Sequence, residues 1–197
     1  MPHYALSDGL VALCAIYGTV VLLRQSEQQA ACRLIAGGFS VIALAALTGT
    51  WRFIRGNDAL FEAPHLLFSD FAGISGFLWI SLGLMGLITR LPVAFTWVCP
   101  LIGYGVLLAL NLTIPALTVT SLFILSVQIL SIIQMMKKKS YRPGVWHILS
   151  TLSLCGVLVI ASIPPLNPDL EWHLYHVVLA AWALFLTLSV KDFLSEK

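Results

Sequence analysis

Charged residues are scarce in this sequence, and their scarcity excludes an ordinary soluble fold. Only 10% of the 197 residues are Asp, Glu, Lys or Arg, whereas 59% are hydrophobic, and the mean hydropathy is +0.93. Charged residues make up about a quarter of a typical globular chain. The formal net charge of +2 is also too small to indicate a nucleic-acid partner. We therefore expect lipid to be the solvent for most of this chain.

Two further absences narrow the class of protein. The four cysteines, Cys14, Cys32, Cys99 and Cys155, show no Cys-x-x-Cys spacing, so neither a disulfide framework nor a thiolate metal site is expected. No cleavable signal peptide is evident, because residues 1–8 carry no Lys or Arg and no small-residue cleavage site follows the first apolar run. We interpret that run as the first helix of the mature protein.

Long apolar runs dominate what remains. Runs of about 17–25 residues can cross a bilayer as α-helices, and seven suitable runs follow one another here. Leu91-Pro92 and Ile114-Pro115 separate neighbouring runs, because proline cannot continue a helix and disfavours a helical residue before it. The sequence predicts an all-α polytopic membrane protein, a single domain over 1–197 with seven transmembrane helices. The predicted spans are 8–23 (with a start as early as Tyr4), 34–51, 65–89, 91–112, 114–136, 145–164 and 173–190.

Positive charge is distributed unevenly between the two sides of this predicted bundle. Nine of the 11 Lys and Arg residues fall on one side, and only Arg52 and Arg55 fall on the other. Cytoplasmic loops of membrane proteins are enriched in Lys and Arg. The C-terminus is therefore predicted in the cytoplasm and the N-terminus outside, and an odd number of spans requires such opposite ends. We expect an integral protein of a bacterial inner (plasma) membrane.

Ionisable groups inside a bilayer are costly and mark candidate sites. Asp70 lies about one and a half turns into the third predicted span, and His65 lies at the start of that span. The seventh span begins on the same outer side with His173 and His176, which share a helix face because they are three residues apart. We predict that these four side chains converge near the outer face. We also predict that three residues at the same depth surround and support this cluster: Thr48, Arg52 and Glu171.

Structural roles for the same residues stay open at this point. The two histidines of the seventh span lie among aromatic residues and can equally belong to an aromatic belt at the headgroups. Asp70 can form a structural ion pair with Arg52 or Arg55. His147 lies at the inner end of the sixth span, and we interpret it as an interfacial anchor rather than as part of the cluster.

Two short segments resemble a known family. Asp70-Phe-Ala-Gly-Ile74 resembles the Asp-Tyr-x-Gly-Ile element that opens helix three in the CREST superfamily of seven-helix membrane hydrolases. His173-Leu-Tyr-His176, followed by Val-Val-Leu-Ala-Ala, resembles the His-rich start of helix seven. That superfamily includes alkaline ceramidases, the progestin and adipoQ receptors, and hemolysin III-like proteins. The resemblance implies a zinc ion bound by histidines, with Asp70 as the catalytic carboxylate and His176 as a ligand. His173 and His65 complete the predicted ligand set, because helix two of this chain has no His.

The leading hypothesis is therefore a zinc-dependent membrane hydrolase that acts on a lipid amide or ester near the outer face. Three neutral imidazoles leave a fourth zinc position for water, and the metal promotes ionisation of that water. Asp70 would orient the water or carry its proton. The expected partners are membrane lipids and a lipid substrate, and no nucleic acid.

The alternative is a non-enzymatic membrane protein, such as a transporter, a sensor or an accessory subunit, in which Asp70 is an ion-binding or structural residue. Low charge and few polar residues in the middle of the spans favour this class. A retinal protein also has seven helices, but it needs a buried lysine for its Schiff base. The only lysine near the seventh span is Lys191, at its inner end, so we set that class aside.

Overall fold

The chain folds into long α-helices in the computed structural model, which describes residues 3–25, 30–56, 59–89, 104–105, 113–163 and 167–196. No strand occurs among these residues. The elements are α1 (Tyr4–Arg24), α2 (Ala30–Ile54), the 3-10 turn η1 (Ala59–Phe61), α3 (Glu62–Phe71), the π-helical turn η2 (Ala72–Gly76), α4 (Phe77–Thr89), α6 (Thr113–Lys137), α7 (Tyr141–Ser162) and α8 (Pro168–Ser195).

Six helices of the described chain are long and apolar enough to cross a membrane. They are α1, α2, the run 59–89 that joins η1, α3, η2 and α4, the 117–137 part of α6, α7 and α8. The all-helical membrane architecture predicted from the sequence is therefore confirmed. The predicted fourth span, 91–112, lies almost wholly outside the described residues, so the count of seven spans stays a prediction.

Most of the helices begin before the predicted spans, and α1 has the earliest start predicted for it. Helix α8 begins at Pro168, where the Asn167 side chain accepts hydrogen bonds from the backbone N–H groups of Asp169 and Leu170 at 3.0 and 3.2 Å. Such a cap satisfies N–H groups that have no partner inside the helix. Helix α1 begins at Tyr4. Its early start places Asp8 one turn inside the first span rather than at its end.

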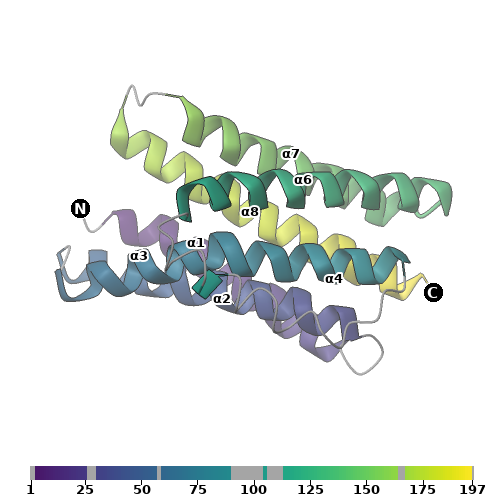
Figure 1. The fold of residues 1–197 in the computed structure, drawn as a ribbon, viewed down its shortest axis with the longest axis horizontal. Helices are drawn as coiled ribbons and strands as arrows, with labels where there is room; N and C mark the ends of the chain where they lie inside the picture. Colours follow the sequence, from purple (N-terminus) through teal and green to yellow (C-terminus); the bar gives the residue numbers. More distant parts are fainter. Residues whose placement is uncertain are drawn as a thin grey trace.

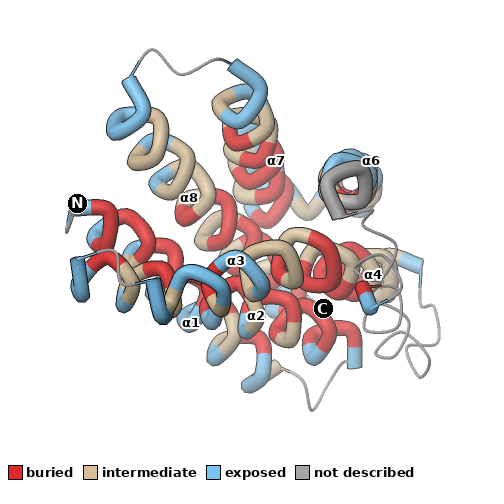
Figure 2. Tube along the Cα trace, turned by 60° about the vertical axis from the view of Figure 1, so that its left-hand side comes forward, coloured by how far each residue is buried: buried red, intermediate tan, exposed pale blue. Residues whose placement is uncertain are grey.

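The helices form one bundle with a shared apolar core (Figure 1). Helices α1 and α2 pack side by side, α8 packs against α1 and α7, and α6 packs against α4 and α7. The rings of Phe39 and Trp182 meet in the core with their centroids 5.8 Å apart, and both residues are fully buried. Figure 2 shows that the start of α8 and the end of α7 project away from α1 and α2, with intermediate or exposed residues. This separation leaves space beside α3 at one end of the bundle.

Glycines allow α2 to approach η2 and α4 closely. A Cβ on Gly38 would lie 2.5 Å from the carbonyl oxygen of Gly76, and a Cβ on Gly83 would lie 2.8 Å from that of Ala31. Backbone atoms cannot turn aside as a flexible side chain can, so these contacts require glycine. Small residues serve the same purpose in membrane helix packing generally. The close contact holds the whole 59–89 run, including α3, against α2.

Most of the basic residues that the structure describes lie at the end of the bundle opposite the start of α3. Arg142 Nε lies 2.9 Å from Asp192 Oδ2, which ties the start of α7 to the end of α8. His147 also lies towards this end, but it is fully buried, and its Nδ1 lies 2.9 Å from Ser189 Oγ. The prediction of an interfacial anchor is therefore wrong for His147, because the packing of α7 on α8 encloses its side chain.

Candidate functional site

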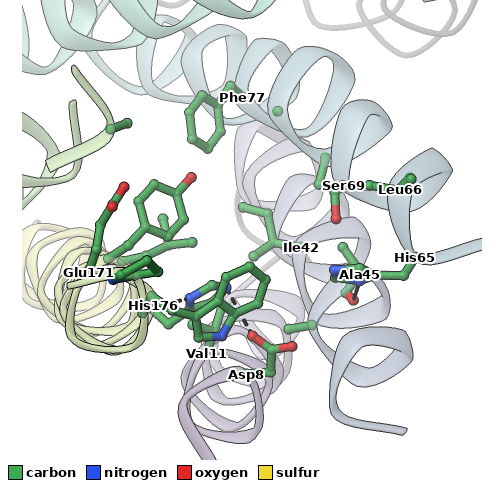
Figure 3. Close-up of a pocket in the computed structure, with 18 residues that line it drawn as sticks. Asp8, Val11, Ile42, Ala45, His65, Leu66, Ser69, Phe77, Glu171 and His176 are labelled. Carbon is green, nitrogen blue, oxygen red and sulfur yellow. Dashed lines mark hydrogen bonds and ion pairs between the residues drawn. The ribbon is translucent and has the colours of Figure 1, made fainter. Parts of the chain in front are cut away.

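A cavity of about 600 Å³ lies between α3 and the first half of α8, and α1 and α2 close a third side of it. Most of the lining is apolar, with Ile42, Phe77 and Leu179 among the larger contributors. Figure 3 shows Glu171 and His176 entering from α8, Asp8 from α1, and His65 and Ser69 from α3. The polar lining residues are Asp8, His65, Ser69, Glu171, Tyr175 and His176.

The cavity exists because α8 is only partly covered near its start. No residue from Pro168 to Leu179 is buried, whereas Ala180 begins the buried half of the helix. The facing helix α3 contributes a single buried residue, His65. Two half-covered helices thus face each other across the space, and α1 and α2 close its far side.

Asp8 and His176 make the central polar contact of the cavity. Nε2 of His176 lies 2.9 Å from Oδ1 of Asp8, and only 1% of the Asp8 side chain is exposed. Two lone pairs would repel at this distance, so one proton lies between the groups. Beyond this contact, neither carboxylate oxygen receives a hydrogen bond from a described residue. Asp8 therefore retains unused acceptor capacity in a buried position, which is unusual for a carboxylate.

The backbone of α8 fixes the orientation of the His176 ring. Its Nδ1 lies 2.7 Å from the carbonyl oxygen of Trp172. A carbonyl oxygen can only accept, so Nδ1 carries a proton and Nε2 is the nitrogen that exchanges one with Asp8. The Trp172 ring also packs on the imidazole, with centroids 4.5 Å apart. Both ring nitrogens of His176 are therefore engaged.

His65 is the second histidine of the cavity and is oriented by α2. Its Nδ1 lies 3.2 Å from the carbonyl oxygen of Ala45, which also accepts a 2.7 Å hydrogen bond from Thr48 Oγ1. Nδ1 of His65 is therefore the protonated nitrogen of the neutral ring. Its Nε2 makes no hydrogen bond with any residue that the structure describes. The lone pair on Nε2 is available to a proton donor that enters the cavity.

Gly49 marks the place where α1, α2 and α3 approach one another. A Cβ added at Gly49 would overlap Oδ2 of Asp8 and would lie 2.7 Å from Cε1 of His65. The Asp8 carboxylate and the His65 ring therefore both lie against the face of Gly49 from which a side chain would project. The absence of a side chain at position 49 allows two acid–base groups from different helices to share one end of the cavity.

An ion pair at the rim positions α3. Nη2 of Arg52, at the end of α2, lies 3.1 Å from Oε1 of Glu62, at the start of α3. The guanidinium also lies over the Phe53 ring, 5.4 Å from its centroid. These contacts bind the first turn of α3 to α2, one turn before His65. Arg52 therefore supports the site without lining the cavity.

The structure brings together some of the residues selected from the sequence and separates others. His65, His176 and Glu171 line the cavity, and Thr48 shares a carbonyl acceptor with His65. His173 lies outside the cavity lining, with Nδ1 3.1 Å from Ser7 Oγ.

Asp70 also lies outside the cavity lining. It is half-buried near the phenol of Tyr104, whose hydroxyl donates a 3.3 Å hydrogen bond to the Leu67 carbonyl. Within the described residues, Arg52 pairs with Glu62 rather than with Asp70. The Asp70 side chain therefore belongs to a different part of the α3 surface from His65.

The donor set at the cavity does not fit the zinc site that the family resemblance implies. Within the residues described, no group of three or more His, Cys, Asp or Glu side chains is placed to hold a metal ion. One nitrogen of His176 is bonded to a carbonyl and the other faces Asp8. His173 lies outside the cavity.

Asp8 is the functional candidate that sequence reasoning missed. The rule that selected Asp70, an ionisable residue within an apolar span, selects Asp8 equally well once the first helix begins at Tyr4. With the other predicted start, at residue 8, Asp8 is the first residue of the span. Asp8 shares a helix face with three apolar residues, Val11, Ala12 and Ala15. This spacing indicates that the side of α1 that carries Asp8 is buried.

Comparison of the chain with protein-family models, curated proteins and solved structures gives no match in any of the three.

Proposed function

We propose that this chain is an integral membrane protein that binds an amphiphilic molecule from the lipid phase in the cavity between α3 and α8. The observation that carries the proposal is a buried Asp8–His176 pair in the wall of a mainly apolar cavity. Ligand sites usually measure about 300–1,000 Å³ and combine apolar walls with a few convergent polar groups. A cavity of about 600 Å³ with this lining has the size and polarity for such a ligand.

The lining has an apolar region and a polar region, so we expect a ligand with a hydrocarbon chain and a polar head. Ile42, Phe77 and Leu179 offer apolar contact to a hydrocarbon chain, and burying each methylene contributes about 0.8 kcal/mol. Asp8 and His65 offer hydrogen-bonding atoms to a polar head, and Asp8 lies on the side of the cavity away from Phe77 (Figure 3). The head would therefore lie against α1 and α2, and the chain would extend towards η2 and α4.

A substitution that fills the cavity tests this proposal. Ala161 lines the cavity from an exposed position at the end of α7, so Ala161→Trp can occupy the space without disturbing the core. Binding of dodecanol to protein in lipid nanodiscs, measured by calorimetry against empty nanodiscs, is expected to weaken severalfold. Ser162→Trp is the matched control, because Ser162 is equally exposed but lies outside the lining. Equal binding by both variants would show that the amphiphile does not occupy this cavity.

We also propose that the cavity faces the outside of a bacterial inner membrane. Arg24, Lys137 and Arg142 lie at the end of the bundle opposite the cavity (Figure 1). Lys and Arg favour the cytoplasmic side, which supports an outer location for the start of α8 and of α3. Reporters fused after Lys197 or within Lys137–Lys139 are expected to give a cytoplasmic signal. An extracytoplasmic signal at either position would place the cavity on the inner face.

Hydrolysis of a lipid amide or ester is a second candidate, supported by the acid–base groups on the cavity wall and by the family resemblance. A water beside His65 Nε2 would give its proton to that nitrogen as its oxygen bonds to the substrate carbonyl. The proton shared by Asp8 and His176 would pass to the leaving amine or alcohol as its bond to carbon breaks. Release of free dodecanoate from a dodecanoyl amide or ester, lost in His65→Gln while binding persists, distinguishes catalysis from binding alone.

A further inference from the structure

We infer that the cavity selects amphiphiles whose polar head is a protonated amine. This inference rests on the proposed binding function and specifies the ligand class. It follows from three features of the lining: the sign of its charges, the unused acceptors of Asp8, and its aromatic side chains.

Apart from the histidines, the charged residues in the described part of the lining are all acidic. Asp8 and Glu171 contribute carboxyl groups, and no Lys or Arg belongs to the lining formed by the described residues. The neighbouring cation, Arg52, is directed to Glu62 at the rim, 3.1 Å away. The Asp8–His176 pair shares one proton and is neutral as a whole, so Glu171 gives the lining its net negative charge, which attracts a cationic head and repels an anionic one.

Asp8 supplies the specific binding atoms. Its side chain is 1% exposed, and apart from the contact of Oδ1 with His176 neither carboxylate oxygen receives a hydrogen bond from the described chain. The contact with His176 involves Oδ1 and leaves Oδ2 towards Gly49 and His65. An ammonium group carries N–H donors and no acceptor, so it can satisfy Oδ2 once the enclosed carboxylate turns towards the cavity. Hydrogen bonds between charged partners are about twice as strong as neutral ones.

Aromatic side chains add a second attraction for a cation. Phe77, Trp172 and Tyr175 all line the cavity. The faces of aromatic rings attract ammonium groups within about 6 Å of the ring centroid, and the attraction grows where water is excluded. A hydroxyl head gains nothing comparable from these rings, and a carboxylate head is repelled by their negative faces.

Three probes of equal chain length test the inference: dodecylamine, dodecanol and dodecanoate. Calorimetry on the full chain in nanodiscs of uncharged lipid, corrected with empty nanodiscs, is expected to give about tenfold tighter binding for dodecylamine than for dodecanol. Dodecanoate is expected to bind more weakly than either. Asp8→Asn keeps the shape of the side chain but removes its charge, and it is expected to abolish the preference for the amine. Asp70→Asn makes the same change on α3 outside the cavity and is expected to preserve it.

The possible results separate this inference from the proposed function. Equal binding of amine and alcohol, or a preference for dodecanoate, would overturn the inference while leaving amphiphile binding intact. Binding of none of the three probes would overturn both. If Asp8→Asn does not fold, the ranking of the three probes on the unaltered chain still decides, and Glu171→Gln removes the second carboxylate of the lining from a half-buried position. Loss of the preference in Asp70→Asn would assign the selecting carboxylate to another site and refute the role of Asp8.

Discussion

His176→Ala is expected to destabilise the protein by about 3–5 kcal/mol, because removal of one partner leaves a buried carboxyl group uncompensated. The Asp8 side chain is 1% exposed, and the contact with His176 Nε2 at 2.9 Å is the interaction that offsets its burial. Chemical unfolding in detergent micelles, followed by helical circular dichroism, measures the loss. His173→Ala is the matched control on the same helix. That change removes a contact to Ser7 Oγ, which is worth about 0.5–1.5 kcal/mol if it is an ordinary hydrogen bond.

A double-mutant cycle shows whether the loss comes from the pair or from the helix. Asp8→Asn removes the charge that His176→Ala leaves unpaired, so the double variant is expected to be more stable than His176→Ala alone. Interacting buried groups typically show coupling of about 0.5–3 kcal/mol in such cycles. Strictly additive losses would mean that Asp8 and His176 do not interact across the α1–α8 interface.

The transmembrane helices could be predicted because lipid imposes a simple constraint on sequence. Every backbone group must be satisfied within the helix, and about 20 apolar residues are needed to cross. The ends were less predictable, because hydropathy decreases before the helix stops. The first turn of α8 contains Asp169 and Glu171 and is helical through its cap at Asn167. Its carboxylates are polar enough to end an apolar run but suit a helix N-terminus electrostatically.

The cavity itself could be predicted only in part. The sequence selected His65 and His176 from their depth in the spans, and both line the cavity. It could not show that α1 packs between α2 and α8, because a single sequence gives the order of helices but not their neighbours. That packing is what brings Asp8 to His176. The five residues from His65 to Asp70 correspond to about 140° around a helix, and Asp70 accordingly lies outside the cavity that His65 lines.

Gly49→Ala is expected to eliminate amphiphile binding, because it places a methyl group where α1, α2 and α3 meet. The new Cβ would overlap Asp8 Oδ2 and lie 2.7 Å from Cε1 and 3.0 Å from Nδ1 of His65. His65 cannot move away from the new methyl group without losing its hydrogen bond to the carbonyl of Ala45, which lies on α2 as Gly49 does. Asp8 cannot withdraw without separating from His176. Overpacking of this kind destabilises proteins by about 1–3 kcal/mol, and the displaced carboxylate no longer faces the head of the ligand.

The matched control for Gly49→Ala is Gly9→Ala, on α1 next to Asp8. A Cβ at Gly9 would lie 3.9 Å from Thr50 Oγ1, an ordinary contact distance. Alanine in place of a helical glycine contributes about 0.5–1 kcal/mol of stability where space allows, so Gly9→Ala is expected to be neutral or stabilising and to bind dodecylamine normally. Calorimetry and unfolding of the two variants provide the comparison. Normal dodecylamine binding by Gly49→Ala at unchanged stability would show that Asp8 and His65 do not meet at this glycine, and the polar end of the cavity would have to be assigned to other residues.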